Sequence, residues 1–258
     1  MADAVSTEIV DRVAVVTIER PEKRNAMDLA VFDGLRAAAE AADADPEVGA
    51  ILVRGRDGTF SSGIDTSIFG GQAEQGITFE FIDRLQSAFT AFEECDTPTV
   101  AAIEGPCFGA GIQLAVACHV RLVAPTAQLS VMEARWGLVP DLGGCVRIPR
   151  LVGLGRATEL TLTARRVGAD EALAIGLAEV ALPAEDPQAA ALDWARRVAA
   201  GPGALRRVPR LLRENLGRDR EAGLRAEAEA QIACIEGPDF KEAVVSSLEG
   251  REPRFVGA

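Results

Sequence analysis

Three polar side chains in the middle of the chain have the types and the spacing to do chemistry on a carbonyl group. Gln113 lies in a run of small and apolar residues, Glu133 follows 20 residues later, and Asp141 follows after 8 more. A carboxylate can take a proton and return it, whereas a glutamine amide only donates and accepts hydrogen bonds at neutral pH. The pattern predicts two carboxylates, Glu133 and Asp141, near a turn rich in backbone donors, an arrangement suited to chemistry on a carbonyl.

A glycine-rich turn just before Gln113 could supply hydrogen-bond donors to a developing oxyanion. Gly109, Ala110 and Gly111 open an apolar run, 112–118, that is typical of a buried helix. Small residues at a helix start expose backbone N–H groups, which stabilise negative charge together with the helix dipole. In isolation, the same residues are also compatible with close packing of a helix on a strand. The segment matches neither a phosphate-binding loop nor a dinucleotide fingerprint.

Several of these residues also have structural interpretations. Glu133 alone could be solvated or cap a helix, and Asp141 could cap a helix that begins near Gly143. His119, the only histidine, is expected to be a hydrogen-bonded structural group. Cys145 could be a reactive thiol at a helix start, although core packing is the favoured interpretation.

Hydrophobic periodicity and the positions of Gly and Pro predict a strand–strand–helix order that recurs along the first part of the chain, without strict alternation of strands and helices. The expected strands cover residues 6–10, 13–19, 50–54, 99–103, 119–124 and 177–182. The expected helices cover residues 29–42, 77–94, 112–118, 146–163 with a break at Gly153, 169–175, 186–200, 203–216, 219–235 and 238–248. Segment 69–76 is expected to be a mobile surface segment.

Composition limits the classes of protein that fit the chain. The 258 residues, 48% hydrophobic and 26% charged, are sufficient for a sizeable core in an ordinary soluble protein. No apolar run reaches the ~20 residues of a membrane span, and the start of the chain lacks the features of a signal peptide, so a cytoplasmic location is expected. The net charge of −12 argues against a nucleic-acid partner. The five cysteines show no metal-binding spacing, so no metal is expected.

Four segments, in order along nearly the whole chain, resemble motifs of the crotonase (enoyl-CoA hydratase/isomerase) superfamily. Segment 20–27 (RPEKRNAM) resembles the early substrate-binding turn, and segment 60–65 (FSSGID) resembles the first oxyanion loop. Segment 108–115 (FGAGIQLA) resembles the second oxyanion loop, and segment 133–144 (EARWGLVPDLGG) resembles the catalytic segment. Each motif is weak alone, but four in register identify the chain as a member of the superfamily.

The resemblance implies an α/β fold of the crotonase type, with a coiled ββα core and a C-terminal α-helical oligomerisation region. The core with the active site is expected over residues 1–185, and the helical region over residues 186–258. In the family, this helical end packs on neighbouring subunits, so a homotrimer or homohexamer is expected.

The resemblance also implies a role for each matching residue. The thioester oxygen of an acyl-CoA substrate is expected between the N–H groups of Ile64 and Ala110, with the catalytic side chains of Glu133, Asp141 and Gln113 beside it. No separate cofactor is expected, because coenzyme A enters as part of the substrate. The substrate-binding positions are expected at Lys23, Arg24, Ala26, Ser62, Gly63, Asp65 and Gly109, with Lys23 and Arg24 near the nucleotide of coenzyme A.

Position 113 bears on the choice of reaction. Hydratases of the family have Glu at the positions of both Gln113 and Glu133, and the pair activates one water. The isomerases work without that pair, and dienoyl-CoA isomerases have an acid at the position of Asp141 but normally Asp at position 113. The favoured hypothesis is an enoyl-CoA double-bond isomerase of fatty-acid metabolism. The alternatives are an enoyl-CoA hydratase using Glu133 and Asp141, and an acyl-CoA-binding protein with little turnover.

Overall fold

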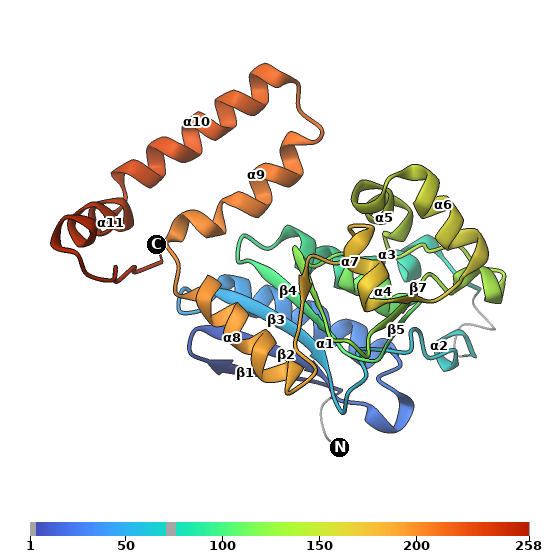
Figure 1. The fold of residues 1–258 in the computed structure, drawn as a ribbon. Helices are drawn as coiled ribbons and strands as arrows, with labels where there is room; N and C mark the ends of the chain where they lie inside the picture. The colour runs from blue at the N-terminus through green and yellow to red at the C-terminus, as the bar shows by residue number, and fades with distance from the viewer. Residues whose placement is uncertain (1–3, 71–75, 258) are drawn as a thin grey trace.

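The computed structural model of the protein describes residues 4–70 and 76–257, and Figure 1 shows its fold. A six-stranded sheet has the order β1-β2-β3-β4-β6-β9. Only β1 and β2 pair antiparallel, and the other neighbours are parallel. The strands are β1 (Val5–Val10), β2 (Val13–Ile18), β3 (Ala50–Gly55), β4 (Thr99–Ile103), β6 (Val120–Val123) and β9 (Val180–Ala181).

Both faces of this sheet are covered, as the continuous apolar sequence of β2 requires. Ala14, Val16 and Ile18 face a large core beneath α1 (Leu29–Ala44) and α3 (Phe79–Glu94), where the rings of Phe32 and Phe89 stack with centroids 5.4 Å apart. The alternate residues of β2 face a smaller core under α8 (Pro187–Ala199). The three buried alanines of α8, Ala191, Ala195 and Ala199, allow this helix to lie close to the sheet.

A second, three-stranded sheet was not predicted from the sequence. It has the order β5-β7-β8, with β5 at Pro106–Phe108, β7 at Gln128–Ser130 and β8 at Val167–Gly168. Strands of two or three residues are too short to show an alternating pattern, so periodicity could not reveal them. This small sheet leads the chain into the glycine turn before Gln113, because β5 ends one residue before Gly109.

The remaining helices lie close to the predicted segments. The apolar run after the glycine turn forms α4 at Ala110–Ala115, two residues earlier than expected, and Glu133 opens a short 3-10 helix, η2, at Glu133–Trp136. The predicted helix 169–175 is α7 (Ala169–Ala174), whereas the helix predicted over 203–216 is divided into η3 (Gly203–Arg206) and α9 (Val208–Asn215). The short helices η1 (Pro21–Lys23) and α2 (Ser67–Gly70) were not predicted. The predicted break at Gly153 separates α5 (Gly144–Val152) from α6 (Leu154–Thr163). Most of segment 69–76 lies outside the described residues.

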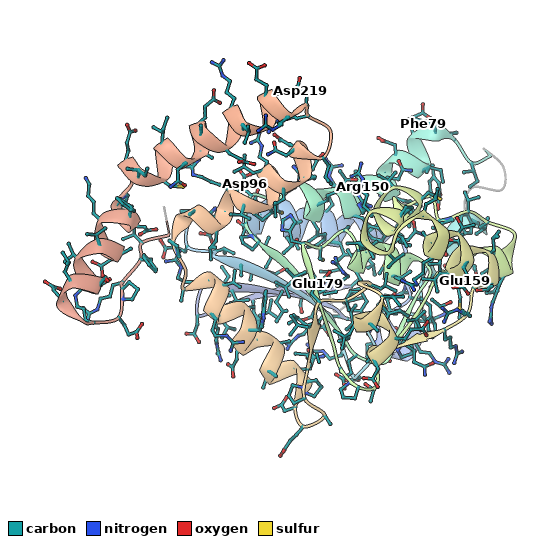
Figure 2. All side chains as sticks on the ribbon, turned by 45° about the horizontal axis from the view of Figure 1, so that its top comes forward. Phe79, Asp96, Arg150, Glu159, Glu179 and Asp219 are labelled. Carbon is teal, nitrogen blue, oxygen red and sulfur yellow. The ribbon has the colours of Figure 1, made fainter. Side chains whose placement is uncertain are left out.

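The C-terminal helices form an arm that projects away from the sheet (Figure 1). It consists of α9 (Val208–Asn215), α10 (Arg220–Glu236) and α11 (Pro238–Glu249), and Asp219, labelled in Figure 2, caps the end of α10 that follows α9. Large apolar side chains of the arm are exposed, with Leu212 at 68%, Leu216 at 70% and Leu248 at 83%. Apolar surface of this kind is typical of a contact with another chain, and the oligomeric state stays a prediction. Among the described residues, no helix is long and apolar enough to cross a membrane.

His119 has a structural position, between α3 and the parallel strands β4 and β6. Its Nδ1 accepts a hydrogen bond from the Thr99 backbone N–H at 3.0 Å, and its Nε2 lies 3.2 Å from the carbonyl oxygen of Glu93. Burial lowers the pKa of His119 to about 4. A neutral ring with its proton on Nε2 satisfies both contacts, whereas a second proton on Nδ1 would face the Thr99 N–H.

Candidate active site

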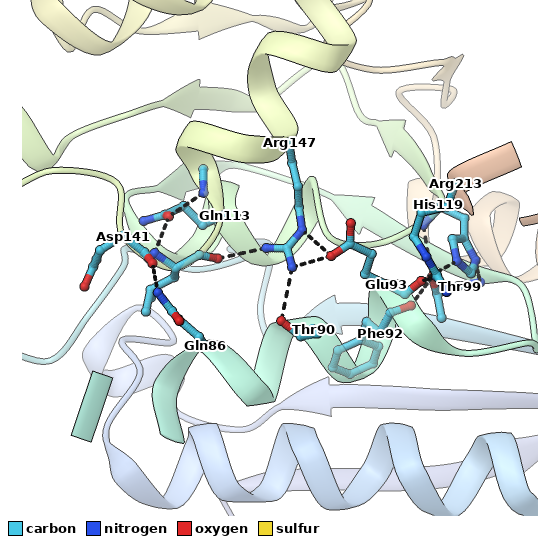
Figure 3. A network of polar contacts seen from close by, with 12 residues as sticks. Gln86, Thr90, Phe92, Glu93, Thr99, Gln113, His119, Asp141, Arg147 and Arg213 are labelled. Atoms are coloured by element: carbon cyan, nitrogen blue, oxygen red, sulfur yellow. Dashed lines mark hydrogen bonds and ion pairs between the residues drawn. The ribbon is translucent and has the colours of Figure 1, made fainter. Parts of the chain in front are cut away.

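The side chain of Gln113 connects three parts of the site. Its Oε1 accepts two backbone hydrogen bonds, from Leu142 N at 2.8 Å and from Gly144 N at 3.0 Å (Figure 3). Its Nε2 donates to Glu133 Oε1 at 2.6 Å. Because the oxygen is fixed by two N–H groups, the amide must present its NH₂ group to Glu133. The side chain is 1% exposed, so these contacts are shielded from water.

Glu133 is buried and only partly satisfied by hydrogen bonds. The residue is 7% exposed, and within the described part of the chain its Oε2 has no hydrogen-bond partner. Burial raises the pKa of the Glu133 carboxyl, and the charge of Asp141 adds to this effect, while the hydrogen bond from Gln113 opposes it. A carboxylate with one fixed oxygen, one free oxygen and a raised pKa is suited to act as a base.

Asp141 lies on the turn between η2 and α5. Helix α5 has no side-chain cap, so Asp141 does not cap it as the alternative interpretation proposed. The turn is held from α3, because Gln86 Nε2 donates to the Asp141 carbonyl oxygen at 2.5 Å (Figure 3). Burial raises the pKa of the Asp141 carboxyl. Among the described residues, its carboxylate accepts no side-chain hydrogen bond.

Two backbone N–H groups are available beside these carboxyls. Ile64 pairs with Met27 in a parallel bridge that uses the Met27 and Asp65 N–H groups, which leaves the Ile64 N–H without a partner in the described structure. Ala110 begins α4, so its N–H has no partner within the helix. Gly109 N, by contrast, donates to the Ser130 carbonyl oxygen at 3.0 Å.

Glycines bring the two donor loops together. Gly63 has a φ of +107°, and a Cβ atom there would lie 3.0 Å from the Phe108 carbonyl oxygen and 3.6 Å from Ala110 N. Gly111 packs on the buried Ser61, whose carbonyl oxygen would lie 2.9 Å from an added Cβ. The close-packing interpretation of the glycine turn therefore holds for Gly111. Of the two N–H groups before it, that of Gly109 is used in a backbone hydrogen bond, whereas that of Ala110 has no partner within α4.

A pocket of about 540 Å³ opens onto these groups. Eight residues proposed from the sequence line it, and the remaining wall is mostly apolar. The predicted lining residues are Ser62, Gly63, Ile64, Gly109, Ala110, Gln113, Glu133 and Asp141. The apolar wall, which sequence reasoning missed, includes Phe69, Ile77, Ile82, Leu85, Met132, Trp136, Leu138, Val139 and Leu142. A possible signal was the apolar cluster 136–139 between two candidate carboxylates, where Trp136 is 69% exposed.

The other predicted substrate residues lie outside the pocket wall. Lys23 ends η1 and Arg24 follows it; both are exposed. The Lys23 carbonyl oxygen accepts a hydrogen bond from the Ser62 side chain, and the Arg24 carbonyl oxygen accepts one from the Ser62 backbone N–H. Ala26 follows on the same turn, and its carbonyl oxygen accepts from Arg20 at 2.6 Å. The Asp65 carboxylate accepts a hydrogen bond from the Ser67 backbone N–H and forms an ion pair of 3.1 Å with Arg20. These contacts, those to Ser67 first, lower the pKa of Asp65.

The sequence matches the family model for enoyl-CoA hydratase/isomerase over residues 8–258. The chain belongs to this family. A relative from Bacillus subtilis (strain 168), named a probable enoyl-CoA hydratase, is 32% identical over 99% of both chains. The fatty acid beta-oxidation multifunctional protein MFP-a of Cucumis sativus glyoxysomes is 38% identical over 73% of this chain, which spans only 26% of that longer protein.

A solved structure with the same fold comes from Thermobifida fusca YX. That protein, described as a candidate enoyl-CoA hydratase in complex with CoA, is 34% identical and superposes with a TM-score of 0.82 over 90% of this chain and 93% of its own. The predicted α/β crotonase fold and the predicted superfamily are therefore confirmed.

The Ala110 N–H can be tested by removing it. Proline lacks this group and is tolerated at the first position of a helix, so Ala110→Pro should fold. Turnover of an enoyl-CoA should fall by about 10²–10³-fold relative to Ala110→Gly, which keeps the N–H. Circular dichroism checks that both variants are folded. Equal rates for the two folded variants would show that Ala110 N is no oxyanion donor.

The coupling between Asp141 and Glu133 predicts a shift in pH dependence. The charge of Asp141 raises the pKa of Glu133, so Asp141→Asn should lower that pKa. Because Glu133 must be ionised to act as a base, the acid limb of the kcat/KM profile should move to lower pH. Asp170→Asn, at an exposed position on α7, is the control and should leave the limb in place. A limb that stays fixed in Asp141→Asn would exclude the coupling.

Proposed function

We propose that the protein is an enoyl-CoA double-bond isomerase of fatty-acid metabolism in which Glu133 is the only base. The fixed direction of the Gln113 amide supports this most strongly. Its NH₂ group faces Glu133 Oε1, so position 113 offers no carboxyl that could share in activating a water. One mobile proton on one carboxylate is sufficient to move a double bond, but hydration of an alkene needs both an acid and a base.

The substrate is bound by three parts of the site. The thioester oxygen accepts hydrogen bonds from Ile64 N and Ala110 N, and the acyl group lies in the mostly apolar pocket of about 540 Å³. Lys23 and Arg24, exposed on the neighbouring turn, lie near the phosphates of coenzyme A. The CoA complex of the Thermobifida relative supports an acyl-CoA substrate. The reaction uses no separate cofactor, because it only relocates a proton.

The proposed reaction conserves atoms and electrons within the substrate and one carboxylate. Glu133 Oε2 takes a proton from the carbon next to the thioester carbonyl of a β,γ-enoyl-CoA. The electrons of that C–H bond delocalise into a dienolate whose negative charge lies on the thioester oxygen, where the two N–H groups stabilise it. Protonated Glu133 then returns the proton to the γ carbon, and the product is the α,β-enoyl-CoA.

A hydratase is the second candidate. The observation in its favour is Asp141, a half-buried carboxyl with a raised pKa that lines the same pocket as Glu133. Glu133 and Asp141 could hold one water between them, with Gln113 orienting it, and the Bacillus relative carries a hydratase name. The isomerase is favoured because Gln113 stands where the hydratases resembled by this chain have a second Glu.

The arm supports a proposal about assembly. The exposed apolar side chains of α9 to α11 are suited to packing on another copy of the chain, and we propose a homotrimer or homohexamer. This assembly agrees with the family resemblance, in which the helical end contacts neighbouring subunits.

Two absorbance assays separate the candidates. An isomerase creates α,β-enoyl absorbance from a β,γ-enoyl-CoA, whereas a hydratase removes this absorbance from an α,β-enoyl-CoA. We expect isomerisation in wild type and its loss in Glu133→Gln, because the variant keeps the shape of the side chain without the base. CoA-ester binding, measured by calorimetry, should persist in the variant. Hydration by wild type without isomerisation would favour the second candidate, and binding without either reaction would indicate an acyl-CoA-binding protein.

Replacing Gln113 by Glu tests the residue on which the choice depends. The new carboxylate could still accept from Leu142 N and Gly144 N with one oxygen, while the other would lie near Glu133 Oε1, which is now 2.6 Å from Gln113 Nε2. Two carboxylate oxygens so close must share a proton, which is the arrangement that addition of water requires. Hydration of a short α,β-enoyl-CoA should rise by about tenfold or more, with a smaller change in isomerisation.

The control for this variant is Gln113→Met, which has a similar size and no charge. It should gain no hydration. If the wild type already hydrates the substrate rapidly and Gln113→Glu does not increase that rate, the isomerase loses its main support.

A further inference from the structure

Arg147, on the first turn of α5, lies behind the catalytic turn and does not line the pocket of about 540 Å³. The residue is 7% exposed, and its Nη1 donates to the Leu142 carbonyl oxygen at 2.9 Å (Figure 3). Leu142 is one of the two residues whose N–H groups hold Gln113 Oε1. The guanidinium therefore contacts one side of the peptide segment whose other side orients Gln113.

The sequence Gly143–Gly144 makes this double contact possible. At Gly143, which has a φ of +94°, an added Cβ would lie 1.9 Å from Arg147 Nη1. At Gly144, an added Cβ would lie 2.9 Å from Gln113 Oε1 and 2.8 Å from the Pro140 Cβ. The two glycines are thus needed for different neighbours: Gly143 for the arginine behind the turn, and Gly144 for the glutamine in front of it.

The charge of Arg147 is compensated from α3. Its Nε and Nη2 both donate to Glu93 Oε2, at 2.9 Å and 2.5 Å, and Nη2 also lies 3.3 Å from Thr90 Oγ1. Figure 3 shows the guanidinium between the turn and α3, with all of these contacts. A planar guanidinium held on three sides has one orientation, and a lysine could reproduce its charge but not its fork.

We propose that Arg147 is a positioning residue for proton transfer: it fixes the 142–144 turn so that Gln113 must turn its NH₂ group, and not its carbonyl oxygen, toward Glu133. This role rests on one part of the proposed function, which is that Glu133 is the base. If the turn moved, the two N–H groups would no longer hold Gln113 Oε1, and the amide could rotate. Glu133 would then lose its fixed oxygen, and with it the orientation of Oε2 toward the substrate.

The loss would also change the protonation of Glu133. The hydrogen bond from Gln113 lowers the pKa of Glu133, and Asp141 is the charged group that raises it. Without the Gln113 contact the pKa of Glu133 rises further, so the acid limb of activity moves to higher pH. A residue that only stabilised the fold would change the melting temperature without moving this limb.

The test measures exchange of the α-protons of butanoyl-CoA for deuterium in D₂O, followed by NMR across pH. This exchange needs a base and oxyanion donors but no double bond, so it does not depend on whether the enzyme is an isomerase or a hydratase. Arg147→Met should lower the exchange rate by about 10- to 100-fold, the usual cost of a misplaced catalytic group, and move the acid limb to higher pH. Arg147→Lys, which keeps the charge, should show a similar shift.

The matched background is Gln113→Met, in which there is no amide to orient. There, adding Arg147→Met should change neither the rate nor the limb further, whereas an effect of the arginine charge or of general stability would persist. If Arg147→Met does not fold, the double variant Arg147→Met with Glu93→Met is used in its place. It removes both charges of the ion pair, so no unpaired charge is left buried. Circular dichroism and calorimetric binding of butanoyl-CoA verify each variant.

The outcomes separate this proposal from the proposed function. An unchanged acid limb in folded Arg147 variants, or an equal loss in the Gln113→Met background, would overturn the positioning role while Glu133 stays the base. Exchange by Glu133→Gln at the wild-type rate would overturn both. Wild-type exchange without isomerisation would overturn the isomerase alone, because the role of Arg147 is decided by the exchange rates and acid limbs of its variants.

Discussion

The hydrogen bonds of the Gln113 side chain are the constraint on which the site depends. They join α4, the 3-10 helix that begins at Glu133, and the turn before α5, three segments that are separate along the chain. An amide has a direction that a carboxylate lacks, and here the two N–H groups of the turn set it. Everything that shapes the turn, including the paired glycines and Arg147, therefore acts on how Glu133 is held. A glutamine amide cannot take a proton at neutral pH, so position 113 bears on the proton chemistry of the site as well as on its packing.

This arrangement has a cost in stability. The pKa of Glu133 in the folded protein is raised above its value in the unfolded chain, chiefly by burial. The folded state therefore binds more protons in the pH interval between the two pKa values, and stability falls as pH rises through that interval. The ionised form of Glu133 therefore destabilises the fold relative to the protonated form, and its Oε2 has no hydrogen bond in the described structure to compensate. A buried, half-satisfied carboxylate is unfavourable for the fold and favourable for a base, because the charge that is poorly solvated is the one that takes a proton readily.

The sequence predicts the parts of this site that depend on long periodic segments better than those that depend on a few residues. The long strands and helices follow hydrophobic periodicity, and the order of four motifs was sufficient for the fold class and the family, both of which are confirmed. Periodicity could not show the strands of two and three residues in the small sheet, whose strand β5 leads directly into the glycine turn. Sequence also left Asp141 open between a helix cap and an active-site acid, and only the uncapped start of α5 decided against the cap. The direction of the Gln113 amide and the contact of Arg147 with the turn arise from tertiary packing, which no local pattern of residues encodes.

The charge distribution offers an independent argument about the substrate. A chain with a net charge of −12 is expected to repel a ligand that carries phosphates, unless cations are left free near the site. Many arginines of this protein are engaged in ion pairs, such as Arg20 with Asp65 and Arg147 with Glu93. Lys23 and Arg24, by contrast, form no ion pair within the described residues and are exposed beside the Ser62 loop. Their backbone is held by η1 and by the contacts to Ser62, so the two side chains extend from a fixed turn. In the proposed complex, these two cations attract the phosphates at a turn next to the oxyanion donors, against the net negative charge of the chain.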